Sequence, residues 1–179
     1  DGDADRVLMI DGAGRSYDGD QLLFAMAKHR HGKQKLSGVA GTLMTNFAFE
    51  KAMARLGIGF ARAKVGDRYV LELLREKGWL LGGENSGHLI CLDKHTTGDG
   101  IVSALQVLEA MRESGRALAE LTAELVMFPQ VLLNVAVRRG FDWKKFPEIA
   151  KAQSVAEKAL NGKGRVLLRP SGTEPVLRV

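Results

Sequence analysis

The chain opens with carboxylates at alternate positions, Asp1, Asp3 and Asp5, in the segment D-G-D-A-D-R. Small residues separate them, so the carboxylates can turn toward one cation. Oxygen ligands of this kind suit Mg²⁺ or Ca²⁺, and three of them leave room for waters and a phosphate, as Mg²⁺ prefers. An EF-hand needs glycine at its sixth position and glutamate at its twelfth, where this chain has Arg6 and Gly12. The segment therefore predicts a Mg²⁺ loop, with a solvated acidic turn as the alternative.

A glycine-rich turn, G-G-E-N-S-G-H, occupies residues 82–88. Its glycines allow a sharp turn and a close approach to a ligand. Glu84 and Ser86 are two apart on an extended stretch, so both can face a pair of sugar hydroxyls. His88 is suited to a phosphate contact or to general acid/base chemistry. The glycine order matches neither a dinucleotide fingerprint nor a Walker loop. A tight hairpin with an internally bonded histidine is the alternative.

A third loop has the sequence R-P-S-G-T-E-P. Ser171 and Thr173 offer hydroxyls, and Gly172 and Thr173 offer backbone N–H groups. Arg169, with Arg178 beyond the loop, adds charge-assisted donors that fit a phosphate. The loop predicts an anion-binding site. The alternative is an ordinary turn between strands, with its arginines in salt bridges.

The segments that must position these loops alternate in periodicity. Strands are expected at Arg6–Ile10, Ser37–Leu43, Ile58–Lys64, Trp79–Gly82 and His88–Leu92. Helices are expected at Gly19–His31, Asn46–Leu56, Tyr69–Glu76 and Asp99–Ser114. The last helix has Ile101, Leu105, Leu108 and Met111 on one face. This alternation predicts a layered α/β domain with a mixed, largely parallel sheet.

The pattern changes near Phe128-Pro129, where proline ends any helix. Beyond it we expect a half-buried strand at Gln130–Arg138, a helix at Pro147–Leu160 and a strand at Arg165–Arg169. This second unit of about 50 residues is small for an independent domain. We therefore expect a smaller, incomplete α+β domain.

Composition excludes several functional classes. The chain has 179 residues, with 26 basic and 21 acidic side chains for a net charge of +5. The excess is spread along the chain, without basic stretches interleaved with aromatics, so we expect no nucleic-acid partner. No apolar run is long enough to span a membrane. The single cysteine, Cys91, lies in an apolar run and is expected to be buried; one cysteine fits a reducing compartment.

Together and in this order, the three loops resemble the α-D-phosphohexomutase superfamily. Members use D-G-D-x-D-R to bind Mg²⁺, G-E-x-S-G-H to select the sugar and R-P-S-G-T-E-P to hold the substrate phosphate. Within the superfamily, D-G-D-Q-L-L from Asp18, K-V-G-D-R-Y-V from Lys64 and T-T-G-D-G from Thr96 look like the bacterial phosphoglucosamine mutase branch. By this analogy Arg68 reaches the substrate, unless it is a surface charge at a helix start. Asp99 is expected to cap a helix.

The resemblance implies a domain layout. Residues 1–6 would be a metal-binding loop from the end of a preceding domain, residues 7–128 the third, sugar-recognising domain, and residues 129–179 a partial C-terminal, phosphate-binding domain. The catalytic phosphoserine of the family would lie upstream of Asp1, with Arg6 and His88 assisting it. We therefore expect a C-terminal fragment that is inactive alone.

The implied reaction interconverts glucosamine 6-phosphate and glucosamine 1-phosphate through a phosphoserine and a bisphosphate, in cytoplasmic amino-sugar metabolism leading to peptidoglycan precursors. A homodimer of the parent enzyme is compatible with the resemblance. One alternative is a mutase of glucose or mannose phosphates. A second is a non-catalytic phosphosugar-binding module. A third, a Ca²⁺-binding interaction domain, is disfavoured by the EF-hand positions.

Overall fold

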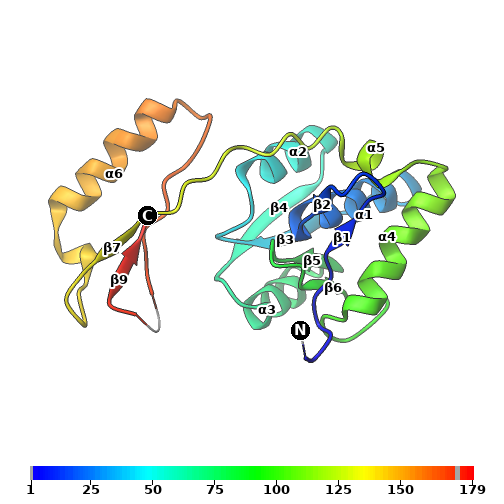
Figure 1. Cartoon of the computed structure of the whole chain (residues 1–179), viewed down its shortest axis with the longest axis horizontal. Helices are drawn as coiled ribbons and strands as arrows, with labels where there is room; N and C mark the ends of the chain where they lie inside the picture. The colour runs from blue at the N-terminus through cyan, green and yellow to red at the C-terminus, as the bar shows by residue number, and fades with distance from the viewer. Residues whose placement is uncertain (1, 172–173) are drawn as a thin grey trace. The chain divides into compact units, whose positions relative to one another are not determined.

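The computed structural model describes residues 2–171 and 174–179 (Figure 1). Internal contacts divide the chain into unit 1, residues 1–127, and unit 2, residues 128–179. Unit 1 carries a mixed sheet with helices, and unit 2 carries a small antiparallel sheet and one α-helix. The predicted fold class is therefore confirmed.

Four strands form the main sheet of unit 1, in the order β4-β3-β5-β6. Strand β3 pairs in parallel with β4 and β5, whereas β6 runs antiparallel to β5. The mixed, largely parallel sheet of the prediction is thus present. The strands are β3 (Gly38–Thr42), β4 (Gly59–Ala63), β5 (Leu81–Gly83) and β6 (Leu89–Cys91).

Local signals set the ends of the helices. Asp18 caps the first helix in a capping box with Gln21. Asn46 and Asp99 cap the second and fourth helices through their side chains. A glycine in the left-handed conformation, Gly57, ends the second. The helices are α1 (Gly19–Lys33), α2 (Phe47–Leu56), α3 (Asp67–Lys77), α4 (Gly100–Ser114) and the unexpected short α5 (Leu118–Thr122).

The sheet is covered on both faces. Val39 and Ala40 are neighbours on β3 and therefore point to opposite faces, yet both are fully buried. On one face Ala40 packs in a cluster with α3 and adjacent strands that also contains Ala63, Val70, Leu74 and Ile90. Helix α1 contacts β5 and packs against α4 and α5. Burial on both faces explains the near-continuous apolar strands.

The apolar face expected on α4 points to solvent. Ile101, Leu105 and Leu108 are 68%, 57% and 49% exposed. The residues that α4 buries are Gly100, Ser103, Val107 and Ala110. Small side chains allow a helix to pack closely, and α4 contacts both α1 and β6. Apolar periodicity therefore identified the helix but not its buried side.

The start of the chain is less extended than expected. Of the predicted strand Arg6–Ile10, only β1 (Met9–Ile10) is formed, and it pairs antiparallel with β2 (Ser16–Tyr17). Arg6 makes an isolated antiparallel bridge with His88 instead. Strand β2 has two residues, too few for a periodic pattern.

Unit 2 contains a three-stranded antiparallel sheet in the order β7-β9-β8. Its elements are β7 (Asn134–Ala136), a 3₁₀ turn (Trp143–Lys145), α6 (Pro147–Leu160), β8 (Arg169–Pro170) and β9 (Val176–Arg178). The strand expected at Arg165–Arg169 thus begins only at its last residue.

The strand expected to be half-buried, Gln130–Arg138, is shorter, and all the residues of β7 are exposed. Among the residues described in unit 2, Leu177 alone is buried. Because so few of these residues are buried, the alternation of apolar and polar residues in the sequence does not mark a face that packs in a core. Across the described chain, no helix is long and apolar enough to cross a membrane.

Candidate functional site

The acidic loop lies beside a buried histidine in unit 1. Oδ2 of Asp5 is 3.7 Å from Nε2 of His88, whose side chain is 5% exposed. Oδ1 of Asp5 is 3.7 Å from Nε of Arg6. Asp3 is exposed, and Asp1 lies outside the described residues. The structure thus brings part of the predicted metal loop against the histidine of the predicted sugar loop.

Backbone contacts fix this arrangement. Arg6 and His88 form the isolated β-bridge, and the N–H of Val7 donates to the carbonyl of Gly87 at 3.0 Å. Gly87 has a φ of +95°, which glycine adopts at little cost. A Cβ at Gly87 would also lie 3.0 Å from the carbonyl carbon of Val7. This position therefore requires glycine for both conformation and space.

The predicted sugar loop is a tight turn between β5 and β6. Glu84 donates its N–H to the carbonyl of His88 at 2.9 Å, and Gly87 donates to the carbonyl of Glu84 at 3.0 Å. The Glu84 carboxylate accepts from the N–H of Gly66 at 2.9 Å. Ser86 is exposed at the tip. The turn is therefore a tight hairpin, with Glu84 and Ser86 on its loop. Nδ1 of His88 is buried without a hydrogen-bond partner among the described residues, so the internally bonded histidine of the alternative is not observed.

Arg68 lies in the first turn of α3, two residues after Gly66. Its Nε is 2.9 Å from Glu72 Oε1, and its side chain is 82% exposed. The hydrogen bond to Glu72 raises the pKa of Arg68. In this structure Arg68 is a surface charge paired along the helix, on the segment that Glu84 holds through Gly66.

The predicted phosphate loop lies in unit 2. Arg169 and Arg178 stand directly opposite each other on β8 and β9. Like charges in this position repel, so an anion between them would relieve the repulsion. Nε of Arg178 is buried and has no hydrogen-bond partner among the described residues, while its Nη2 pairs with Glu174 at 3.1 Å. Ser171 Oγ accepts from the Glu174 N–H at 3.2 Å.

The other two residues predicted for this loop, Gly172 and Thr173, lie outside the described residues. The described part of the loop therefore supplies the paired arginines and the Ser171 hydroxyl.

The acidic loop fits a hard cation. Oδ1 of Asp5 is buried and has no hydrogen-bond partner in the described chain. A buried carboxylate oxygen without a donor is costly unless a cation or water satisfies it. Residues 2–171 and 174–179 contain no group of three His, Cys, Asp or Glu that could hold a metal. Of the three predicted ligands, Asp3 and Asp5 lie in the described part of the chain and Asp1 does not.

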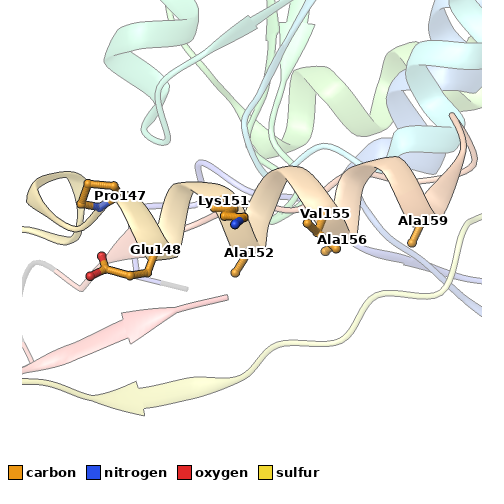
Figure 2. Close-up of a pocket in the computed structure, with 7 residues that line it drawn as sticks. All are labelled: Pro147, Glu148, Lys151, Ala152, Val155, Ala156 and Ala159. Carbon is orange, nitrogen blue, oxygen red and sulfur yellow. The ribbon is translucent and has the colours of Figure 1, made fainter.

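An open hollow of about 810 Å³ runs along α6 in unit 2 (Figure 2). Its lining is mainly alanine and valine, and includes none of the predicted site residues that the structure describes. The lining residues are Pro147, Glu148, Lys151, Ala152, Val155, Ala156 and Ala159. We find no chemistry there that matches the loops.

The sequence did not identify three glycines that pack closely against other segments of unit 1. A Cβ at Gly19 would lie 2.7 Å from the N of Gly87. A Cβ at Gly98 would lie 2.6 Å from Cε1 of His88, and one at Gly100 2.5 Å from the carbonyl oxygen of Arg6. The sequence pattern places Gly19 and Gly100 at expected helix starts, and the resemblance covers Gly98 and Gly100, but neither indicates these close contacts.

Two family models match the chain. The model described as phosphoglucomutase/phosphomannomutase, alpha/beta/alpha domain III, matches residues 18–127. The model described as phosphoglucomutase/phosphomannomutase, C-terminal domain, matches residues 132–179. Neither match covers residues 1–17, which carry the acidic loop, or residues 128–131.

Curated relatives match over the whole chain. A phosphoglucosamine mutase of Janthinobacterium sp. (strain Marseille) is 61% identical over 179 residues. One of Dechloromonas aromatica (strain RCB) is 62% identical over the same length. In both cases the match covers 100% of this chain and 40% of the relative. The chain thus spans well under half the length of these relatives.

Solved structures share the fold. Aspergillus fumigatus N-acetylphosphoglucosamine mutase, in complex with GlcNAc-6P and magnesium, has a TM-score of 0.78 at 21% identity, over 99% of this chain and 46% of that chain. A putative phosphomannomutase from Thermus thermophilus has a TM-score of 0.66 at 29% identity, over 70% of this chain and 29% of that one. By its domain matches, this chain belongs to the phosphoglucomutase/phosphomannomutase family.

Proposed function

We propose that this chain is part of a Mg²⁺-dependent phosphosugar mutase that interconverts glucosamine 6-phosphate and glucosamine 1-phosphate. Relatives about 60% identical carry the name phosphoglucosamine mutase. The chain spans 40% of their length, so the activity is proposed for the complete gene product that contains residues 1–179.

The observation that supports this proposal most is the contact between the acidic loop and the turn at residues 84–88. Asp5 faces His88 at 3.7 Å, and the Arg6–His88 bridge ties the two loops together. A cation and a sugar can therefore be bound side by side in unit 1. A solvated acidic turn would not need a buried histidine beside it.

We assign the cation to Asp1, Asp3 and Asp5. Oδ1 of Asp5 is buried without a hydrogen bond from any described residue, which supports this assignment. When bound, Mg²⁺ supplies positive charge that stabilises negative charge developing on a transferring oxygen. His88 is 4% exposed, so we assign it to orienting Asp5 and not to proton exchange with substrate. The exposed Arg6 is assigned to contact a phosphate.

We propose that Glu84 and Ser86 of unit 1 contact the sugar and, separately, that the paired arginines of unit 2 contact a substrate phosphate. Glu84 and Ser86 suit sugar hydroxyls. Arg169 and Arg178, with Ser171, suit a phosphate. Arg68 is assigned to the substrate as well, which requires it to leave its pair with Glu72. Gly172 and Thr173 complete the phosphate loop in this proposal.

The reaction conserves phosphate. A phosphoserine of the complete protein loses its phosphoryl group as its O–P bond breaks and a sugar oxygen bonds to phosphorus. The proton of the sugar hydroxyl ends on the serine oxygen, and a sugar bisphosphate forms. After reorientation, the other phosphoryl group returns to serine and the proton to the sugar. Positioning and electrostatic stabilisation supply most of the catalysis in such transfers.

The proposal locates this reaction in the cytoplasm, in amino-sugar metabolism. Cys91 is the one cysteine of the sequence, and its thiol is buried with a pKa raised to about 11, mainly by burial. A chain without disulfide pairing fits a reducing compartment.

The test is a comparison of kcat/KM on the complete gene product with the 6-phosphates of glucosamine, glucose and mannose. The proposal predicts the highest value for glucosamine 6-phosphate. A higher value for glucose or mannose would assign the protein to that branch instead. No turnover of any of the three would favour a phosphosugar-binding module.

A further inference from the structure

We propose that the segment Gly98–Gly100, where α4 begins, is a positioning element that holds the acidic loop and His88 in one arrangement. The inference deepens the proposed function and rests on it for the role of the acidic loop. The two glycines are proposed as positioning residues, which act through the loops they contact and touch no substrate.

Gly98 packs directly on the imidazole of His88. A Cβ at Gly98 would lie 2.5 Å from Cδ2 and 2.6 Å from Cε1 of the ring, and closer still to Nε2. Nε2 is the atom that faces Asp5 Oδ2 at 3.7 Å. Any side chain at position 98 would therefore push the ring out of its place beside Asp5.

The ring has little freedom to move aside. His88 is 4% exposed, so close packing restrains the ring, while the bridge to Arg6 anchors the main chain of His88. Its carbonyl also accepts from the N–H of Glu84 at 2.9 Å. Displacing the imidazole would therefore disturb the residues that we assign to the cation and to the sugar.

Gly100 contacts the acidic loop itself. Its N–H donates to the carbonyl of Ala4 at 2.9 Å. A Cβ there would lie 2.5 Å from the carbonyl oxygen of Arg6 and 2.9 Å from that of Ala4. These neighbours are backbone atoms, which cannot rotate away as a side chain can.

The hydrogen bond to Ala4 stabilises an unfavourable conformation. Ala4 lies between Asp3 and Asp5 with a φ of +55°, a region that residues with a Cβ rarely adopt. Such a conformation persists only where surrounding contacts hold it. The N–H of Gly100 bonds to the carbonyl of Ala4, so the start of α4 sets the curvature of the acidic loop.

Asp99 fixes where α4 begins. Its Oδ1 accepts from the N–H groups of Ile101 and Val102 at 2.8 and 2.9 Å. This cap leaves the N–H of Gly100 directed at Ala4 and not into the helix. Of the three consecutive residues, Gly98 contacts His88, Asp99 caps α4 and Gly100 contacts the acidic loop.

The first test measures Mg²⁺ affinity by isothermal titration calorimetry on the complete gene product. Gly98→Ala and Gly100→Ala should each weaken Mg²⁺ binding by about 10- to 100-fold, as changes to residues that orient metal ligands do. Gly32→Ala is the matched control, because a Cβ at Gly32 meets no atom within 4 Å. It should leave Mg²⁺ affinity unchanged. Equal affinities for all three variants would overturn the inference.

The second test is a double-substitution cycle on unfolding by urea, which does not depend on metal. Gly98→Ala should lower the unfolding midpoint in the parent protein, and much less in a His88→Ala background, where no ring remains to clash. An equal loss in both backgrounds would overturn the proposed contact. Should Gly98→Ala not fold, a folded Gly98→Ala/His88→Ala protein supports the contact, and an unfolded one contradicts it.

The two tests separate this inference from the proposed function. If the parent protein binds no Mg²⁺, the proposed cation site fails, while the cycle still decides whether Gly98 positions His88. If the parent binds Mg²⁺ and neither glycine variant differs from Gly32→Ala, the positioning role fails and the cation site stands.

Discussion

The carboxylate of Glu84 accepts a hydrogen bond from the backbone N–H of Gly66, with an N···O distance of 2.9 Å. Glu84 follows β5 and Gly66 follows β4, so the bond joins loops at the carboxyl ends of two strands of one sheet. Ligands of α/β sheets bind at such ends. Glu84 therefore has two separable tasks: it holds the segment that contains Arg68, and it is proposed to bind the sugar.

Substitutions at Glu84 should separate these tasks. Glu84→Gln keeps an acceptor for Gly66, so the free energy of unfolding should change little. Glu84→Ala leaves that N–H without its partner and should cost about 1 kcal/mol. Both should raise KM for the phosphosugar, because both remove the carboxylate. Urea unfolding and steady-state kinetics measure the two effects. Unchanged KM in Glu84→Ala would remove Glu84 from the substrate site.

Asp20 should make stability depend on pH. It is buried with its Oδ2 accepting from the Asn46 N–H at 2.7 Å. Burial raises the pKa of Asp20 from 3.8 to about 7. The hydrogen bond from Asn46 opposes this rise, as do Arg62 and Thr45, whereas repulsion from Asp18 adds to it. The folded state therefore binds the proton more tightly than the unfolded state. The stabilisation is full below about pH 4 and is lost as pH rises through about 7.

Asp20→Asn removes this titration and keeps an oxygen for the Asn46 N–H. The parent should lose up to about 4 kcal/mol between pH 4 and pH 8 relative to the variant, from a shift of roughly three pKa units. Urea unfolding at several pH values measures the difference. A difference that is constant across this range would mean that Asp20 ionises normally.

Gly19 should tolerate no side chain, in contrast to Gly32 on the same helix. A Cβ at Gly19 would lie 2.7 Å from the N and 2.9 Å from the Cα of Gly87, and closer to the carbonyl of Glu84. Gly19→Ala should therefore cost about 1–3 kcal/mol. Gly32→Ala should stabilise by about 0.5 kcal/mol, because alanine favours the helix. Equal unfolding midpoints would contradict the close packing of α1 on the turn.

Arg178→Ala should weaken substrate binding more than it weakens the fold. Its pair with Glu174 is partly exposed and contributes about 0–1 kcal/mol. Loss of a charged donor to a phosphate should raise KM about 10- to 100-fold. Arg139→Ala is the control, since Arg139 carries the same charge on an exposed site of unit 2. An equal rise in KM for Arg178→Ala and Arg139→Ala would show that only net charge matters.

Much of unit 1 could be predicted from sequence because its signals are local. Asp18 and Asn46 mark helix starts, and Gly57 marks an end. The strands are continuous apolar runs because both faces of the sheet are covered. The prediction of which side of α4 is buried was wrong. Ile101 and its apolar neighbours face solvent, while small residues pack inward.

The site was less predictable. The three loops could be located by residue type, but the contact of Gly98 with His88 joins segments that sequence spacing does not relate. The hydrogen bond between Glu84 and Gly66 likewise joins residues that are far apart in the sequence. In unit 2, with Leu177 as the buried residue of the described part, no core imposed a periodic pattern on the strand expected at Gln130–Arg138.

The chain alone should be inactive if the phosphoserine lies outside residues 1–179. Purified residues 1–179 should give no glucosamine 1-phosphate from glucosamine 6-phosphate, with or without added glucosamine 1,6-bisphosphate. Turnover by this chain would require a nucleophile within it, with Ser86 and Ser171 as the candidates to substitute first.

The most direct test is phosphorus NMR of the complete gene product with glucosamine 6-phosphate and Mg²⁺. We predict a second phosphate resonance, from glucosamine 1-phosphate, that stops growing when EDTA is added, and a strongly reduced rate in Asp5→Asn. No interconversion, or a rate indifferent to both EDTA and Asp5→Asn, would contradict the claim that the acidic loop beside His88 is the cation site of a phosphosugar mutase.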